Sequence, residues 1–238
     1  MGRGSSPQLS QHSGLAGDGL FGFARFRLCA RGLTGVLGLC GILGFSRGGL
    51  KDGPLDREVC HQGGHAVLGF EAHIPLLMDN VNGTQMSLKT AAGPNGVLVV
   101  SSCNTCPFVV GNGEKSDGWE GRYNETARFA KENGVSMVLV NSNEAKRDNH
   151  DSMEAMQQHA KENGYGMPYL LDANHQLADA FGALKTPHVY LFNSDLTLVY
   201  RGAIDDNVND ASAVADRYVQ NAIKAVAAGE PCNVAETK

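Results

Sequence analysis

The feature that most constrains the fold is a continuous apolar run, Gly96-Val-Leu-Val-Val100, which leads directly into Ser-Ser-Cys-Asn-Thr-Cys-Pro. Such a run, rich in β-branched residues and without polar alternation, is typical of a central parallel strand that is buried on both faces. The two cysteines of the motif, Cys103 and Cys106, are therefore predicted to lie where a buried strand ends.

From residue 73 onward, the pattern predicts an alternation of strands and helices. Residues 75–80 and 85–89 are expected to pair as a hairpin around a turn at 81–84. Further strands are predicted at 135–140, 168–171, 189–192 and 197–200, and helices at 119–130, 152–163, 176–182 and 210–228. The early strands should be parallel and the late hairpin antiparallel. The predicted fold class is therefore α/β, a central mixed sheet with helices on both faces.

Glycine is unevenly distributed, and this sets the expected domain organisation. Residues 1–72 contain 17 of the 30 glycines and no tyrosine or tryptophan. We therefore interpret residues 1–72 as a Gly-rich, poorly ordered extension and residues 73–238 as one globular domain.

Part of this extension has the composition of a targeting segment. Residues 19–50 contain no acidic residue, and three arginines precede an apolar run at 33–45. Thirteen residues are too few for a membrane span of roughly 20, but they suit the apolar part of a signal sequence. An organelle transit peptide, a disordered extension or a start codon placed too far upstream would also fit. Export to the periplasm or medium, or targeting to an organelle, is expected, and membrane association is not.

Charge and cysteine usage exclude other classes of protein. The net charge is −5, with no block of Lys or Arg, so nucleic acid is not an expected partner. The six cysteines include one close pair, which differs from the dense spacing of a disulfide scaffold. Redox chemistry or metal binding is therefore favoured over a role in structural disulfides.

The spacing of the pair suggests how it would react. Cys103 is predicted to stand at a helix N-terminus, where unpaired N–H groups and the helix dipole stabilise a thiolate. A thiol pKa lowered from about 8.5 to about 7 would leave about half of the thiol ionised at neutral pH. Cys103 is thus the expected nucleophile, and Cys106, one turn later, the expected resolving cysteine. Pro107 suits the first helical turn.

A second motif, Thr186-Pro187-His188, immediately precedes the strand expected at 189–192. In this context we predict a cis peptide bond between Thr186 and Pro187, lying across from Cys103. The general frequency of cis X–Pro bonds is only about 5–6%, so the prediction depends on the fold.

Longer segments around these motifs resemble the peroxiredoxin-like branch of the alkyl hydroperoxide reductase/thiol-specific antioxidant (redoxin) family, in the thioredoxin superfamily. They are Val-Leu-Val-Val-Ser-Ser-Cys-Asn-Thr-Cys-Pro-Phe, Lys-Thr-Pro-His-Val-Tyr-Leu-Phe and Val-Tyr-Arg-Gly-Ala-Ile-Asp-Asp-Asn. The resemblance covers about residues 73–238. It implies a thioredoxin fold, redox roles for Cys103 and Cys106, and a substrate-binding position at Thr186 and the cis-proline Pro187.

The resemblance also implies a function, which is thiol–disulfide exchange in redox homeostasis or antioxidant defence. The expected partners are protein or small-molecule disulfides and a thiol electron donor, and no cofactor is expected. Departures from the family pattern favour this activity over the alternative, a thiol-dependent peroxidase. Peroxiredoxins carry Thr and Pro three and seven residues before the reactive cysteine, where this chain has Val100 and Gly96. Thioredoxin has a buried acid where this chain has Val97, so water or another acid must serve.

Three other interpretations of the function are open. Copper or zinc could bind Cys103, Cys106 and His188, but the second ligand pair of a structural zinc site is missing. A calcium loop at 205–216 has Asp where Gly and Glu are required, so an ordinary loop is favoured. A non-enzymatic interaction module would not need the intact cysteine pair. The cysteines at 29, 40, 60 and 232 are expected to have no role.

Overall fold

The computed structural model describes residues 68–72 and 74–238. The predictions for the Gly-rich extension up to residue 67, including the targeting segment at 19–50 and three of the cysteines, lie outside the described residues. Within them, no helix combines the length and the apolar character needed to cross a membrane.

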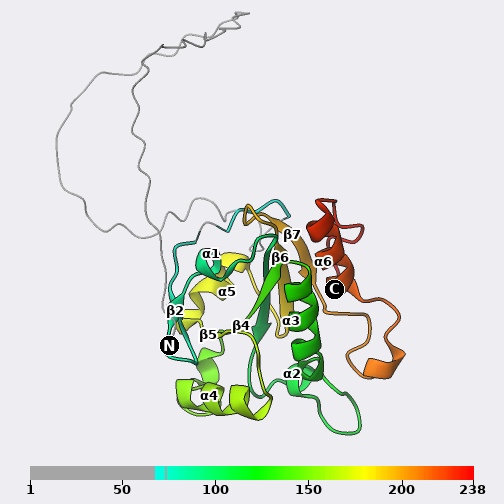
Figure 1. Ribbon diagram of the computed structural model, residues 1–238. Coiled ribbons are helices and arrows are strands. Elements are labelled where there is room, and N and C mark those ends of the chain that lie inside the picture. The colour runs from blue at the N-terminus through cyan, green and yellow to red at the C-terminus, as the bar shows by residue number, and fades with distance from the viewer. Residues whose placement is uncertain (1–67, 73) are drawn as a thin grey trace, which may run out of the picture. The chain divides into compact units, whose positions relative to one another are not determined.

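Within the described residues, seven strands form one mixed sheet in the order β2-β1-β5-β4-β3-β6-β7 (Figure 1). The strands are β1 (Met78–Asn80), β2 (Gln85–Met86), β3 (Gly96–Ser102), β4 (Val135–Asn141), β5 (Tyr169–Leu171), β6 (His188–Phe192) and β7 (Leu198–Gly202). The central strands β3, β4 and β5 are parallel, whereas β6 is antiparallel to both β3 and β7. The predicted mixed sheet and both hairpins are confirmed.

Helices cover both faces of this sheet (Figure 1). They are α1 (Leu88–Ala91), α2 (Pro107–Val110), α3 (Tyr123–Glu132), α4 (Met153–Glu162), α5 (Gln176–Phe181) and α6 (Tyr218–Ala228). Every residue of β3 is buried. Leu98 and Val100 pack with α3, α4 and α6, whereas Val97 and Val99 pack with α1 and α5. Because both faces are covered, β3 needs the continuous apolar run that the sequence has.

Two predicted elements differ most from the structure, in both cases because side chains bind nearby backbone groups. Ser87 is the N-cap residue of α1, within a segment where a strand was expected, since Ser87 and Thr90 form a reciprocal capping box. The last helix begins at Tyr218 rather than Asp210. The Asp210 carboxylate accepts the N–H of Ser212 in a short 3₁₀ turn, and Asp206 accepts the N–H of Ala215. Such bonds compete with helix formation.

The folded domain also includes a few residues before position 73. The N–H groups of Gly69 and Ala72 donate to the carbonyls of Leu198 and Leu196, at 2.9 and 2.8 Å. Phe70 packs edge-on against the ring of Phe181. Residues 69–72 are therefore part of the domain, next to β7.

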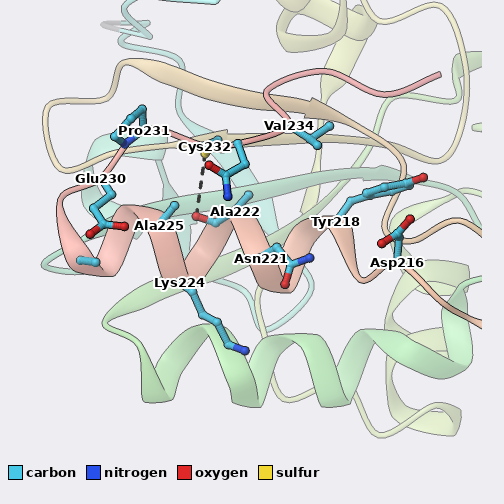
Figure 2. A pocket seen from close by; sticks show the side chains of 12 residues that line it. Asp216, Tyr218, Asn221, Ala222, Lys224, Ala225, Glu230, Pro231, Cys232 and Val234 are labelled. Carbon is cyan, nitrogen blue, oxygen red and sulfur yellow. Dashed lines mark hydrogen bonds between the residues drawn. The ribbon is translucent and has the colours of Figure 1, made fainter.

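The C-terminal segment returns to the outer edge of β7. Thr237 Oγ1 accepts the N–H of Ala203 and hydrogen-bonds with the hydroxyl of Tyr200. Before this segment, Cys232 lines a groove of about 440 Å³ along α6, and its Sγ lies 3.9 Å from the carbonyl of Ala222 (Figure 2). Burial raises the pKa of the Cys232 thiol.

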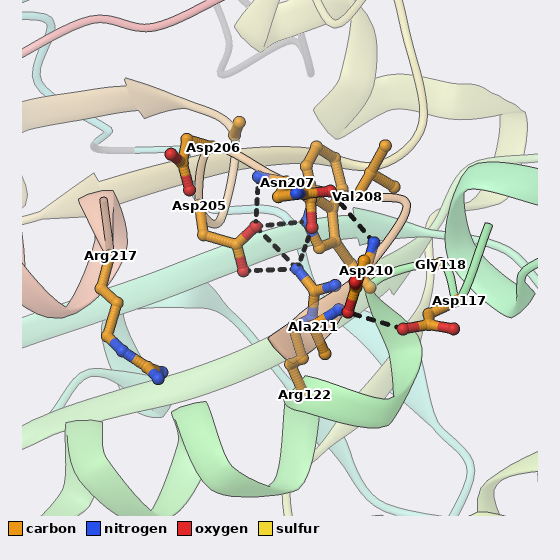
Figure 3. Close-up of polar contacts among 12 residues, drawn as sticks. Asp117, Gly118, Arg122, Asp205, Asp206, Asn207, Val208, Asp210, Ala211 and Arg217 are labelled. Carbon is orange, nitrogen blue, oxygen red and sulfur yellow. Dashed lines mark hydrogen bonds and ion pairs between the residues drawn. The ribbon is translucent and has the colours of Figure 1, made fainter. Parts of the chain in front are cut away.

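A buried ion pair fixes the loop after β7 (Figure 3). Arg122 Nη1 lies 2.6 Å from both carboxylate oxygens of Asp205, and Trp119 Nε1 donates to the same carboxylate at 3.0 Å. Asn207 Oδ1 accepts the N–H groups of Asn209 and Asp210. The carboxylate of Asp205 and the amide oxygen of Asn207 are therefore engaged within the protein, as in an ordinary loop.

Replacing Asp205 should be much more destabilising than breaking a surface ion pair. The Arg122 and Asp205 side chains are 13% and 6% exposed, so Asp205→Ala would leave a buried guanidinium without its counter-ion. We expect the free energy of unfolding in urea to fall by about 3 to 5 kcal/mol. Glu236→Ala, which breaks the exposed pair with Arg201, is the control and should cost less than about 1 kcal/mol. Equal losses of unfolding free energy in the two variants would contradict this prediction.

Candidate active site

The two cysteines lie at the carboxyl end of β3, but not as predicted relative to the helix. Cys103 directly follows β3, the chain bends at Asn104 and Thr105, and Cys106 is the N-cap residue of α2. The prediction that Cys103 stands at a helix N-terminus is therefore wrong. Pro107 lacks an N–H and favours the first helical position, which explains why the helix begins there.

The two thiols are free and differ in exposure. Cys103 is only 6% exposed, whereas Cys106 is half-buried. Burial raises the pKa of Cys103 to about 11, and the negative charges of Cys106 and Asp151 add to the increase, although the N–H of Thr105 opposes it. The pKa of Cys103 thus moves in the opposite direction from the one predicted, because loss of hydration dominates.

The Thr186–Pro187 peptide bond is cis, which confirms the prediction. Its direct contact is with the second cysteine, since Cys106 Sγ donates to the carbonyl of Thr186 at 3.1 Å. The pairing of Ser101 with His188 between β3 and β6 brings the proline loop to this end of the sheet.

Both thiols line one open cavity of about 440 Å³. Its other polar lining residues come from β3, the loop after β4, the start of α5 and the proline loop, and are Ser101, Ser142, Asn143, His175, Asp179, Lys185 and Thr186. Leu184, which also lines it, is 77% exposed, and Phe108 in α2 is 58% exposed. Exposed apolar side chains therefore lie beside this cavity and on the neighbouring helix α2.

A buried polar network, which was not predicted from the sequence, underlies the cysteine loop. The carboxylate of Asp151, which is wholly buried, accepts the N–H of Asn104 at 2.8 Å and the side-chain amides of Asn141 and Asn143 at 2.7 Å each. The Tyr169 hydroxyl donates to Asn104 Oδ1 at 2.8 Å. A signal existed, because Asn141 and Asn143 end a buried parallel strand, as Cys103 does, and such strand ends meet at one edge.

Other residues considered for chemistry do not join the pair. His188 Nδ1 lies 2.8 Å from the hydroxyl of Tyr190, its neighbour in β6. Among residues 68–72 and 74–238, no group of three or more His, Cys, Asp or Glu side chains is arranged to hold a metal ion. Cys232 lines the groove along α6 instead of the cavity at Cys103.

Comparison with known proteins identifies the family. The Redoxin family matches residues 67–217, well over half of the chain. The chain belongs to the Redoxin family. This redoxin is similar to a solved structure of an uncharacterized conserved protein from Geobacillus kaustophilus, with 32% sequence identity and a TM-score of 0.62. The match covers 70% of this chain and 85% of that one.

Two further structures resemble this redoxin. A hypothetical protein from Sinorhizobium meliloti has 28% identity and a TM-score of 0.60, with 72% of this chain and 91% of that one covered. The peroxidoxin BcpB from Mycobacterium tuberculosis has 12% identity and a TM-score of 0.51 over 69% and 98% of the two chains, which shows the shared fold. A comparison with curated proteins finds no match. The redoxin therefore has a thioredoxin-like fold and is an oxidoreductase.

Limited alkylation of the reduced protein should label Cys106 before Cys103. The buried Cys103 forms its thiolate only as the pH rises towards its pKa of about 11. In a Cys106→Ser variant, alkylation of Cys103 should therefore accelerate about tenfold per pH unit from neutral to about pH 10. Iodoacetamide labelling followed by peptide mass spectrometry measures both effects. Preferential labelling of Cys103 at neutral pH would contradict the expected order of labelling.

Proposed function

We propose that this redoxin is a thiol–disulfide oxidoreductase that uses Cys103 and Cys106 as a dithiol/disulfide pair. The observation that carries the proposal is that two free thiols, three residues apart, line one open cavity beside the cis-proline Pro187. The substrates would be protein or small-molecule disulfides, held against Thr186 and Pro187. A thiol donor would restore the reduced pair.

We assign the attack to Cys106 instead of Cys103, the residue expected from the sequence. Cys106 is the more exposed thiol and contacts the proline loop, whereas Cys103 is buried with a raised pKa. The Cys106 thiolate would attack one sulfur of the substrate disulfide, forming a mixed disulfide and releasing the other sulfur as a thiolate that takes up a proton. Cys103 would then lose its proton and attack Cys106 Sγ. This forms the Cys103–Cys106 disulfide, releases the second substrate thiol and transfers two electrons to the substrate.

Single replacements should separate the two roles. We expect Cys106→Ser to abolish reduction of a model protein disulfide such as insulin, because the attacking thiol is lost. Cys103→Ser should still attack but should accumulate a mixed disulfide, visible as a mass increase that a reductant reverses. Cys232→Ser is the matched control and should retain full activity, since Cys232 lies in another groove. If Cys103→Ser abolished reduction and Cys106→Ser accumulated the mixed disulfide, Cys103 would be the nucleophile.

A thiol-dependent peroxidase is the second candidate, because a dithiol at the same site could also reduce a peroxide. In peroxiredoxins, a Thr three residues before the reactive cysteine helps to bind the peroxide. Counted from Cys106, that position is Cys103, and counted from Cys103, it is the buried Val100. Neither offers a hydroxyl group, which favours disulfide exchange.

The reduced protein should therefore react slowly with hydrogen peroxide and faster with a disulfide. Stopped-flow measurement of both second-order rate constants on the same sample tests this. Val100→Thr gives the useful comparison, since it restores a hydroxyl group in β3. A fast reaction of the wild-type protein with peroxide would favour the peroxidase instead.

A further inference from the structure

We propose that Asn104 is a positioning residue for the dithiol: its hydrogen bonds hold the turn between the cysteines in a shape that lets the Cys103–Cys106 disulfide close. The inference rests on the proposed dithiol function and deepens it, because it names what sets the stability of that disulfide. Asn104 and Thr105 are the two residues between the cysteines. Any freedom of this turn therefore becomes freedom in the separation of the two sulfur atoms.

Asn104 is held from three directions by residues that are distant in the sequence. Its N–H donates to the carboxylate of Asp151, and its Nδ2 donates to the main-chain carbonyl of His150, both at 2.8 Å. Its Oδ1 accepts the hydroxyl of Tyr169, also at 2.8 Å. The N–H and both polar side-chain atoms of Asn104 are thus engaged, although the residue is only half-buried.

The groups that hold Asn104 are themselves fixed at the ends of strands. Tyr169 begins β5 and is 1% exposed, and its hydroxyl accepts the side-chain amide of Asn141, the last residue of β4, at 3.0 Å. Arg147 donates to the main-chain carbonyls of Asn141 and Asp151, at 3.0 and 2.6 Å. The turn between the cysteines is therefore attached to the edge of the sheet.

The two cysteines are held by the same framework in the reduced protein. The N–H groups of Thr105 and Cys106 interact with the sulfur of Cys103, and Cys106 Sγ donates to the carbonyl of Thr186 at 3.1 Å. Ordering a flexible segment has an entropic cost, and here the hydrogen bonds of Asn104 have already ordered the turn. Closing the disulfide needs little further ordering, which raises the effective concentration of one sulfur at the other.

The test is the equilibrium of the full-length protein with glutathione. The reduced pair gives two electrons and two protons to glutathione disulfide, which becomes two glutathione molecules, and the Cys103–Cys106 disulfide forms. Alkylation of the remaining thiols followed by mass spectrometry measures the oxidised fraction.

Loss of the hydrogen bonds should make this disulfide less stable. Asn104→Ala should lower the equilibrium constant for its formation about tenfold, which raises the reduction potential by about 30 mV. Tyr169→Phe loses one hydroxyl group and keeps the packing of its ring, so it should fold and lower the constant about threefold. A constant that is unchanged in both variants would overturn the proposal. A larger constant would overturn it as well, because it would mean that the turn holds the sulfurs apart.

Each variant has a matched control elsewhere in the sheet. Asn95, which precedes β3, is also half-buried, and its Nδ2 donates to the carbonyl of Asn133 at 2.8 Å. Tyr200 in β7 is as buried as Tyr169, and its hydroxyl hydrogen-bonds with Thr237. Asn95→Ala and Tyr200→Phe should lower stability but leave the equilibrium constant in place. Equal shifts in these controls would reduce the effect to general loosening, against the proposal.

A second measurement needs no substitution. The N–H of Asn104 should be protected from hydrogen exchange, followed by NMR, in both the reduced and the disulfide form, because the same hydrogen bonds hold the turn in both. Loss of this protection on oxidation would mean that the hydrogen bonds break as the disulfide forms, and the proposal would fail.

These outcomes are separable from those of the proposed function. If the wild-type protein formed the disulfide with glutathione but did not reduce insulin, the proposed function would fail while the positioning role of Asn104 would stand. If insulin were reduced but the variants kept the wild-type equilibrium constant, the positioning role alone would fail. A wild-type protein that formed no Cys103–Cys106 disulfide would overturn both.

Discussion

The arrangement of the site depends on the burial of β3 between two layers of helices. Hydrogen bonding to β4 on one side and β6 on the other fixes the register, with Ser102 opposite Asn141 and Ser101 opposite His188. The register therefore sets where Cys103 emerges, where the polar Asn141 ends its strand and where the cis-proline loop returns. A slip of one residue would exchange the side chains that β3 presents to its two helical layers, so the packing of both layers fixes the geometry of the site.

The same burial produces the chemical asymmetry of the pair. Both thiols line the cavity, but Cys103 is buried, where loss of hydration raises its pKa to about 11, and Cys106 three residues later is more exposed. Polar groups that end buried strands must find partners, and here Asn141 and Asn143 find the carboxylate of Asp151. The hydrogen bonds that complete the sheet edge thus also hold the Asn104 turn between the two cysteines.

The parts of this structure that could be predicted were those encoded locally. The run Gly96–Val100 and the run Val135–Val140 indicated buried parallel strands, and Thr186-Pro187 before a strand indicated the cis bond. The exact start of the helix after the cysteines and the contacts of Asp151 were not predicted. The start of α2 at Pro107 moved the N-cap from Cys103 to Cys106. Asp151 is 48 residues from Cys103 in the printed sequence, and only the pairing of β3 with β4 brings its loop to the thiols.

The raised pKa of Cys103 also bears on the direction of electron flow. Strongly oxidising dithiol proteins owe their potential to a reduced form that is stabilised as a thiolate. Here the reduced pair gains no such stabilisation from Cys103, because that thiol is protonated at physiological pH. In the proposed dithiol, a protonated Cys103 would favour the Cys103–Cys106 disulfide over the reduced pair more strongly than in those oxidants. For the proposed dithiol, this asymmetry favours electron flow from the protein to its substrate, as a reductase requires.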